Sequence, residues 1–161
     1  MTSQTLVPPQ IGAPAPDFSL RDQHGQEVSL SGLQGQAAAL IVFYPFAFSG
    51  VCQGELREIR DQLDDFRSRG VQVLAVSCDP MFSLRAWAEA ESYEFPLLAD
   101  FWPHGEVARA YGVFNDKVGA ATRGSFLVDQ AGVLRWSVVN EMREARDVDA
   151  YRKAIADLAT A

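Results

Sequence analysis

Cysteine and histidine are scarce in this sequence, with two of each among 161 residues. Two cysteines cannot form the disulfide framework of a small secreted protein, which favours a reducing, cytoplasmic location. Neither cysteine belongs to a C-x-x-C pair, and His24 and His104 have no partner at the spacing of metal ligands. We therefore expect no metal centre and no cofactor.

Basic residues and long apolar runs are also few. The chain has 14 Lys and Arg against 21 Asp and Glu, a net charge of −7. Such a surface repels a phosphate backbone, so nucleic acid is not an expected partner. The N-terminus lacks the basic start and continuous apolar run of a secretory signal, and no stretch approaches the roughly 18 apolar residues of a membrane span. No membrane association is expected.

The length suits one domain with a hydrophobic core, and neither an internal repeat nor a linker divides the chain. We expect residues 1–161 to form a single domain, with residues 1–9 as a mobile lead-in.

The apolar pattern alternates between strand and helix periods. Expected strands are 16–20 paired with 26–30, then 37–44, 71–77, 95–100, and a second hairpin at 124–130 and 133–139; expected helices are 52–66, 82–92, 105–113 and 148–158. The runs 37–44 and 71–77 are almost entirely apolar, which is typical of strands buried on both faces of a parallel sheet. This order predicts a thioredoxin-like α/β fold. Its central, mostly parallel sheet would carry helices on both faces, an N-terminal β-hairpin, and antiparallel strands added at one side.

The stretch PFAFSGVC, residues 45–52, follows the carboxyl end of strand 37–44. Functional sites of open α/β sheets gather beyond that edge. Cys52 begins a helix and is in phase with Leu56 and Ile59, so its side chain faces inward. Ser49 stands at the expected N-cap of this helix.

Two interpretations of Cys52 follow from its position. Free cysteine often only fills a core, and inward placement fits that role. The positive end of a helix also favours a thiolate, although a nearby cation is needed as well. Arg123, just before a buried strand, is a candidate for that cation, but it also fits a surface arginine. A cysteine–histidine hydrolase would need His104 and a third residue that nothing in the sequence identifies.

The residues around Cys52 resemble the active-site pattern of the peroxiredoxin family, P-x-x-x-[T/S]-x-x-C, with Pro45, Ser49 and Cys52 at the required offsets. VLAVSCDP, FPLLAD and RGSFLVD resemble later segments of the same family. PFAFSGVCQGEL and FPLLADFWPHGEVARAYGVFN are most similar to its one-cysteine alkyl hydroperoxide reductase E group of actinobacterial type.

The resemblance implies a thiol-dependent peroxidase. The thiolate of Cys52 would attack a hydroperoxide and form a sulfenic acid. The hydroxyl of Ser49, the guanidinium of Arg123 and the backbone N–H of Cys52 would hold the peroxide oxygens. Pro45 would shield the sulfur, and Glu55 would orient Arg123.

Aromatic residues around this stretch are assigned to substrate binding. Phe46 and Phe48 would line an apolar mouth suited to hydrogen peroxide and to organic or fatty-acid hydroperoxides, although ordinary turn packing also explains them. Trp102, in FWPHG, would lie near that mouth or at a dimer contact, and core packing is the alternative.

The second half of the cycle requires a thiol. Cys78 ends a buried strand and is interpreted as a small buried hydrophobic residue, and Arg57 stands where some relatives carry a resolving cysteine. We therefore expect an external reductant: a low-molecular-weight thiol with a mycoredoxin or glutaredoxin-like protein, or else thioredoxin. A homodimer is expected by resemblance. The alternative is a non-catalytic redox sensor or chaperone that passes oxidation to a partner protein.

Overall fold

The computed structural model describes residues 8–159, which contain a seven-stranded sheet. In spatial order its strands are β2 (Glu27–Ser29), β1 (Ser19–Arg21), β5 (Leu97–Ala99), β4 (Val71–Ser77), β3 (Ala38–Phe43), β8 (Arg123–Val128) and β9 (Leu134–Asn140). The helices are α1 (Gly50–Asp61), α2 (Leu63–Ser68), α3 (Met81–Glu91), α4 (Glu106–Ala110) and α5 (Val148–Leu158), with a 3-10 turn η1 (Ser31–Leu33). Residues 1–7 of the predicted lead-in lie outside the described residues.

The thioredoxin-like α/β fold with an N-terminal β1–β2 hairpin is as predicted, but the sheet is mixed rather than mostly parallel. Only the β3–β4 and β4–β5 pairs are parallel. The pairs β1–β2, β1–β5, β3–β8 and β8–β9 are antiparallel, so antiparallel strands flank the parallel centre on both sides, not one. An apolar run reports burial and not direction, which is why β8 beside β3 could not be oriented from the sequence.

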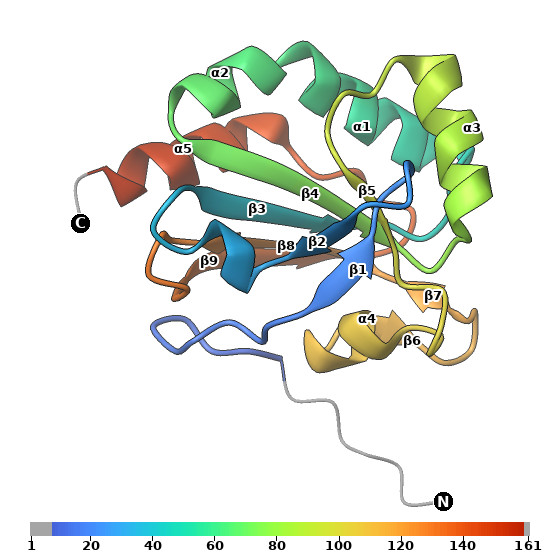
Figure 1. The fold of residues 1–161 in the computed structure, drawn as a ribbon, viewed down its shortest axis with the longest axis horizontal. Coiled ribbons are helices and arrows are strands. Elements are labelled where there is room, and N and C mark those ends of the chain that lie inside the picture. Colours follow the sequence, from blue (N-terminus) through green and yellow to red (C-terminus); the bar gives the residue numbers. More distant parts are fainter. Residues whose placement is uncertain (1–7, 160–161) are drawn as a thin grey trace, which may run out of the picture.

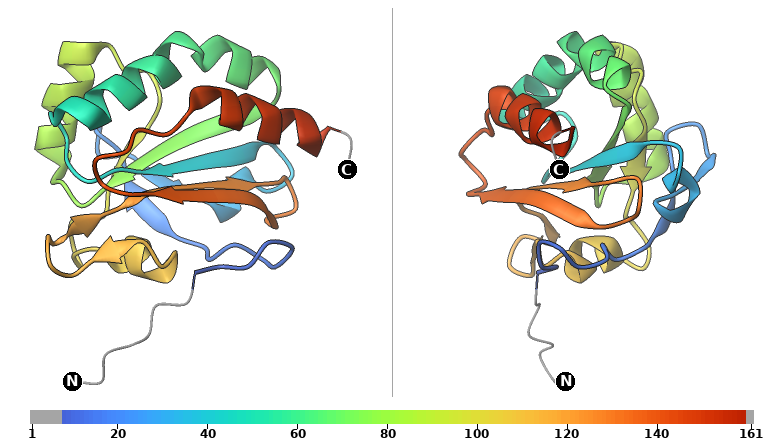
Figure 2. Two further views of the ribbon diagram at one scale, coloured as in Figure 1. Left: turned by 180° about the vertical axis from the view of Figure 1, so that it is seen from behind. Right: turned by 90° about the vertical axis from the view of Figure 1, so that its left-hand side faces the viewer.

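Layers cover both faces of the sheet (Figure 1). One face packs against α1, α2, α3 and α5 through a core that includes Leu40, Val73, Leu56 and Trp87. The other face is covered by α4, η1 and residues 8–18, and Figure 2 shows residues 8–18 on the side of the sheet away from α5. Successive side chains of β3 and β4 point to opposite faces of the sheet and therefore pack into two separate cores.

The predicted helix 52–66 is divided in two. α1 ends at Asp61, Gln62 leaves helical geometry at φ −105° and ψ 4°, and α2 begins at Leu63. The apolar phase survives the break because Leu63 and Phe66 still face the same core as α1. A short ladder of β6 (Phe114–Asn115) and β7 (Ala120–Ala121) was not predicted, because two-residue strands leave no periodic signal.

Backbone hydrogen bonds fix the chain that leads into the sheet. Gly12 N–H donates to Leu134 O at 2.8 Å, and Leu134 N–H donates to Ala13 O at 3.0 Å. The segment beyond the predicted lead-in therefore lies against the start of β9. Among the residues that the structure describes, no helix has the length and apolar composition needed to cross a bilayer.

Candidate active site

The turn between β3 and α1 is held by the next parallel strand. Ala47 N–H donates to the carboxylate of Asp79 at 2.8 Å, and Ser77 Oγ donates to the same carboxylate oxygen at 2.7 Å. Phe48 has φ 68°, in the left-handed region that a bulky side chain rarely adopts. This backbone turn brings the chain from the end of β3 into α1, and Pro45 within it is buried. The loop after β4 thus positions the residues that follow β3.

Cys52 lies in the first turn of α1 with its side chain fully buried. Ser49 is at the N-cap position, as predicted, and its carbonyl accepts the Gln53 N–H at 2.9 Å. The hydroxyl of Ser49, however, makes no capping hydrogen bond, nor has it a hydrogen-bond partner elsewhere in residues 8–159. The Ser49 hydroxyl is therefore free to form a hydrogen bond with a ligand.

Arg123 approaches Cys52 from the neighbouring strand. It is the first residue of β8, which pairs with β3, and its NH1 lies 3.2 Å from Cys52 Sγ. The same NH1 donates to Glu55 Oε1 at 2.5 Å, and Nε donates to Met142 O at 2.6 Å. The side chains of Arg123 and Glu55 are only 3% and 4% exposed. The interpretation of Arg123 as a surface arginine is therefore wrong.

Arg146 completes the cluster, although no pattern in the sequence indicated it. It lies between β9 and α5, and its Nε and NH2 donate to the two carboxylate oxygens of Glu55 at 2.8 and 3.0 Å. Its NH1 donates to Phe43 O, Gly124 O and Ser125 Oγ at 2.7 to 3.0 Å. In the sequence it belongs to a run of charged residues, REARD, whose other members are exposed. No spacing or periodicity distinguishes it from them.

The charges of this cluster are unequal. Burial alone raises the pKa of Glu55, but the hydrogen bonds and charge of Arg146, with the charge of Arg123, outweigh it and hold that pKa below its usual range. One carboxylate faces two buried guanidinium groups, so one positive charge is left without a carboxylate partner, 3.2 Å from Cys52 Sγ. Because a buried charge is costly without a partner, this site favours a negatively charged group beside Arg123.

The aromatic residues assigned to the mouth differ in their surroundings. Phe46 and Phe48 are 40% and 56% exposed, and the ring of Phe48 packs 6.0 Å from that of Trp87. Trp102 is 83% exposed, and its side chain makes no ring contact or hydrogen bond within the described chain. The structure therefore does not bring Trp102 to Cys52, and core packing of this side chain is excluded.

Cys78 is remote from this chemistry. It is 6% exposed and belongs to the core on the opposite face of the sheet from Cys52. Burial, with the nearby carboxylate of Asp100, raises the pKa of its thiol to about 12. Both cysteines are free, and no cluster of three or more potential metal ligands occurs among residues 8–159.

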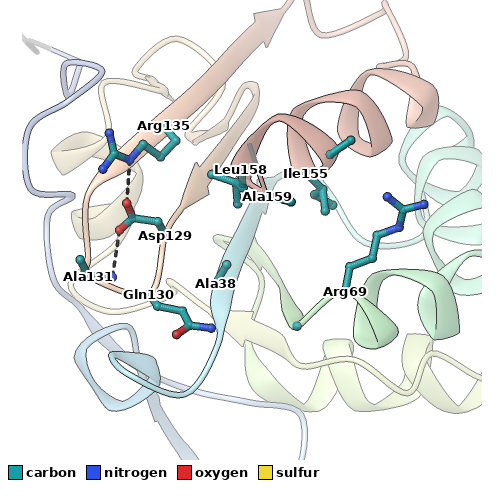
Figure 3. A pocket seen from close by; sticks show the side chains of 11 residues that line it. Ala38, Arg69, Asp129, Gln130, Ala131, Arg135, Ile155, Leu158 and Ala159 are labelled. Carbon is teal, nitrogen blue, oxygen red and sulfur yellow. Dashed lines mark hydrogen bonds and ion pairs between the residues drawn. The ribbon is translucent and has the colours of Figure 1, made fainter. Parts of the chain in front are cut away.

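A cavity of about 540 Å³ lies elsewhere (Figure 3). Ala38 and Gly70, which line it, stand at the amino ends of β3 and β4, whereas Cys52 follows the carboxyl end of β3. Arg135 crosses its rim to Asp129 at 2.6 Å. This cavity takes no part in the cluster around Cys52.

A thioredoxin-like sheet with a buried cysteine, a paired arginine and an uncommitted hydroxyl at one helix start defines a thiol-based redox protein. Residues 11–137 match the model of the AhpC/TSA family. Alkyl hydroperoxide reductase E of Mycobacterium tuberculosis is 47% identical over 148 residues, which cover 92% of this chain and 97% of that protein. Peroxiredoxin-2 of Rattus norvegicus is 38% identical over 86% of this chain and 74% of that protein.

Solved structures agree with these relatives. The reduced 2-Cys peroxiredoxin of Plasmodium vivax superposes with a TM-score of 0.86 at 27% identity, over 95% of this chain and 83% of that one. AhpC of Enterococcus faecalis gives a TM-score of 0.83 at 30% identity, over 92% of each chain. The chain therefore belongs to the AhpC/TSA family. It is a peroxiredoxin of the alkyl hydroperoxide reductase type, a thiol peroxidase that reduces hydroperoxides.

Proposed function

We propose that Cys52 is the peroxidatic nucleophile and that Arg123, Ser49 and Pro45 form its peroxide site. The observation that carries this assignment is the 3.2 Å contact between Arg123 NH1 and Cys52 Sγ inside a buried cluster with excess positive charge. The thiolate attacks the terminal oxygen of the hydroperoxide and the O–O bond breaks. The sulfur is oxidised by two electrons to a sulfenic acid, while the leaving alkoxide or hydroxide takes a proton from water.

The surrounding donors stabilise charge as it develops on the leaving oxygen. Arg123 supplies N–H groups, and the free hydroxyl of Ser49 and the backbone N–H of Cys52 stand at the same helix start. Glu55 orients Arg123 by a charge-assisted hydrogen bond. Pro45 shields the sulfur without adding a donor.

For the substrate we propose hydrogen peroxide together with organic or fatty-acid hydroperoxides. The support is the exposed apolar surface of Phe46 and Phe48 in the turn that leads to Cys52. Trp102 is exposed and does not contact this apolar surface within one chain. Its assignment to substrate binding requires a second subunit or bound peroxide to bring it close to Cys52. Comparing oxidation rates with hydrogen peroxide, cumene hydroperoxide and a fatty-acid hydroperoxide tests the choice, and equal effects of Phe48→Ala on all three would contradict it.

We further propose that an external thiol resolves the sulfenic acid. Cys78 is buried on the other face of the sheet, and Arg57 occupies the position five residues after Cys52. A low-molecular-weight thiol with a mycoredoxin or glutaredoxin-like protein is the proposed reductant, with thioredoxin as the alternative. A cytosolic location follows from this need for reduced thiols.

A homodimer is also proposed. The loops after β3 and β5 expose Phe48 and Trp102, and the first turn of α3, which follows β4, exposes Phe82. All three follow the carboxyl ends of parallel strands and so lie toward one edge of the sheet. Exposed aromatic side chains in this number favour a protein interface. Sedimentation of Trp102→Glu should shift toward monomer, whereas Val139→Glu, on the edge strand β9, should leave the assembly unchanged.

The peroxidase assignment is tested by single-turnover oxidation followed through the fluorescence of Trp87, whose ring contacts Phe48. We expect Cys52→Ser to abolish the peroxide-dependent signal, and Cys78→Ser to keep both the signal and turnover with external thiols. Loss of turnover in Cys78→Ser with the first oxidation intact would make Cys78 a resolving residue. A wild-type reaction no faster than that of free cysteine would favour the non-catalytic redox sensor or chaperone.

A further inference from the structure

Full burial of Cys52 conflicts with reduction by an outside thiol. A thiolate must contact the sulfur of the sulfenic acid in line with the S–O bond to form a mixed disulfide, releasing the hydroxyl group as water after protonation. The Cys52 side chain is 0% exposed, so no thiol touches Sγ in this conformation. The first turn of α1 must therefore move before the second half of the cycle.

That first turn has little local stability of its own. It lacks a side-chain cap at Ser49, and glycines stand at positions 50 and 54. Glycine disfavours a helix because it loses more backbone freedom on ordering than other residues do. Cys52 is the only buried residue of this turn, while the rest of α1 is anchored in the core by Leu56 and Ile59.

One residue of α3 holds the turn from outside. Glu91, the last residue of α3, accepts a short hydrogen bond from the side chain of Gln53, the neighbour of Cys52. It also binds Arg57 through Nε at 2.7 Å and NH2 at 2.9 Å, and its carbonyl accepts from Arg60 NH1 at 2.8 Å. Tyr93 adds a hydrogen bond to Gln53 O at 3.4 Å. Three side chains of α1 thus converge on a single glutamate.

We propose that Glu91 is a latch that holds the first turn of α1 closed over Cys52 and sets how readily an external thiol reaches the oxidised sulfur. The latch is a positioning device, because Glu91 touches neither Sγ nor Arg123. The hydrogen bond from Arg57 lowers the pKa of Glu91, so its carboxylate is ionised at neutral pH and the latch is closed there. Closure of the turn by Glu91 does not depend on the proposed function, whereas its effect on reduction of the sulfenic acid does.

Labelling of reduced Cys52 by DTNB in a Cys78→Ser background tests the latch without any peroxide. Because the closed state hides Sγ, the labelling rate follows the population of the open turn. Glu91→Gln should raise that rate by roughly three- to tenfold, as expected when a charge-assisted hydrogen bond is lost. Gly54→Ala should lower it, since an added Cβ there meets no atom within 4 Å and only stiffens the helix. Glu58→Gln, an exposed change of equal charge on the same helix, should leave it unaltered.

Kinetics of the two half-reactions complete the test. We expect Glu91→Gln to speed reduction of the sulfenic acid by dithiothreitol by a larger factor than it changes oxidation of Cys52 by hydrogen peroxide, because a dithiol needs a wider opening at Sγ than a peroxide does. Equal labelling rates in wild type, Glu91→Gln and Gly54→Ala would overturn the latch, as would a Glu58→Gln effect as large as that of Glu91→Gln. Faster labelling in a protein that does not react with peroxide would support the latch while refuting the peroxidase assignment.

Discussion

Replacement of Arg146 by methionine tests whether the buried arginine, and not only Arg123, maintains the active site. The substitution keeps much of the side-chain length and removes five side-chain hydrogen bonds: two to Glu55, and one each to Phe43 O, Gly124 O and Ser125 Oγ. Glu55 retains the backbone N–H at position 146 and NH1 of Arg123. The Glu55 carboxylate therefore remains buried, but it faces one guanidinium group instead of two.

The expected loss of stability is large. Removing one partner of a buried ion pair costs about 3–5 kcal/mol, because the remaining charge is left uncompensated. At about 2–4 °C per kcal/mol for a chain of this size, the melting temperature should fall by roughly 6–20 °C. Since domains are stable by about 5–15 kcal/mol, the variant should still fold at room temperature. Arg152→Met removes a half-exposed arginine of α5, with ion pairs to Asp65 at 3.4 Å and to Asp149 at 3.9 Å, and should cost less than about 1 kcal/mol.

Urea denaturation and stopped-flow peroxide oxidation supply the two measurements. Oxidation of Cys52 should slow by roughly tenfold or more in Arg146→Met, because Glu55 no longer holds Arg123 in one position, but less than the 10²–10³-fold typical when a catalytic donor is removed outright. If Arg146→Met were as stable as Arg152→Met and oxidised at the wild-type rate, the buried network would have no part in positioning Arg123.

Two further predictions concern single carboxylates. Glu55→Gln should lower the rate at which peroxide oxidises Cys52 by about 10²-fold, because an amide nitrogen would face the N–H donors of Arg123. The exposed control Glu58→Gln should have no effect, and stopped-flow fluorescence measures both rates. Burial raises the pKa of Asp100 to about 6, above the ordinary 3.8, so the folded protein retains a proton that the unfolded chain releases. The stability that this group contributes is therefore lost as pH rises from about 4 to 6, by up to roughly 3 kcal/mol. Urea denaturation of wild type and Asp100→Asn measures this loss. If the difference in unfolding free energy between the two proteins did not change over this pH range, the raised pKa would be contradicted.

Periodicity in the sequence was sufficient to predict the order of the long elements and the inward direction of Cys52. The 3–4 spacing of Cys52, Leu56 and Ile59 survives in α1, and the apolar runs at 37–44 and 71–77 became the central strands. Spacing could not show that β8 lies antiparallel to β3, and so it could not bring Arg123 to the sulfur. Pairing across a sheet depends on contacts far apart in the sequence, which leave no local pattern.

The charged side chains of the site were the hardest to predict. Arg146 and Glu91 both occur among other charged residues in the sequence, and a burial pattern assigns such residues to solvent. Each is selected only by what folding places opposite it: Glu55 for Arg146, and Gln53 with Arg57 for Glu91. Their roles follow from electrostatic pairing in three dimensions.

The sheet that separates Cys52 from Cys78 has a consequence for how the protein responds to its surroundings. Because the hydrogen-bonded sheet lies between them, the effective concentration of the Cys78 thiol at Cys52 is practically zero, although the two residues are close in the sequence. On the proposed function, the lifetime of an oxidised Cys52 is therefore set by the concentrations of free thiol and of further peroxide, which compete for the same sulfur. On the same proposal, the oxidation state of Cys52 follows the ratio of oxidant to reductant around the protein.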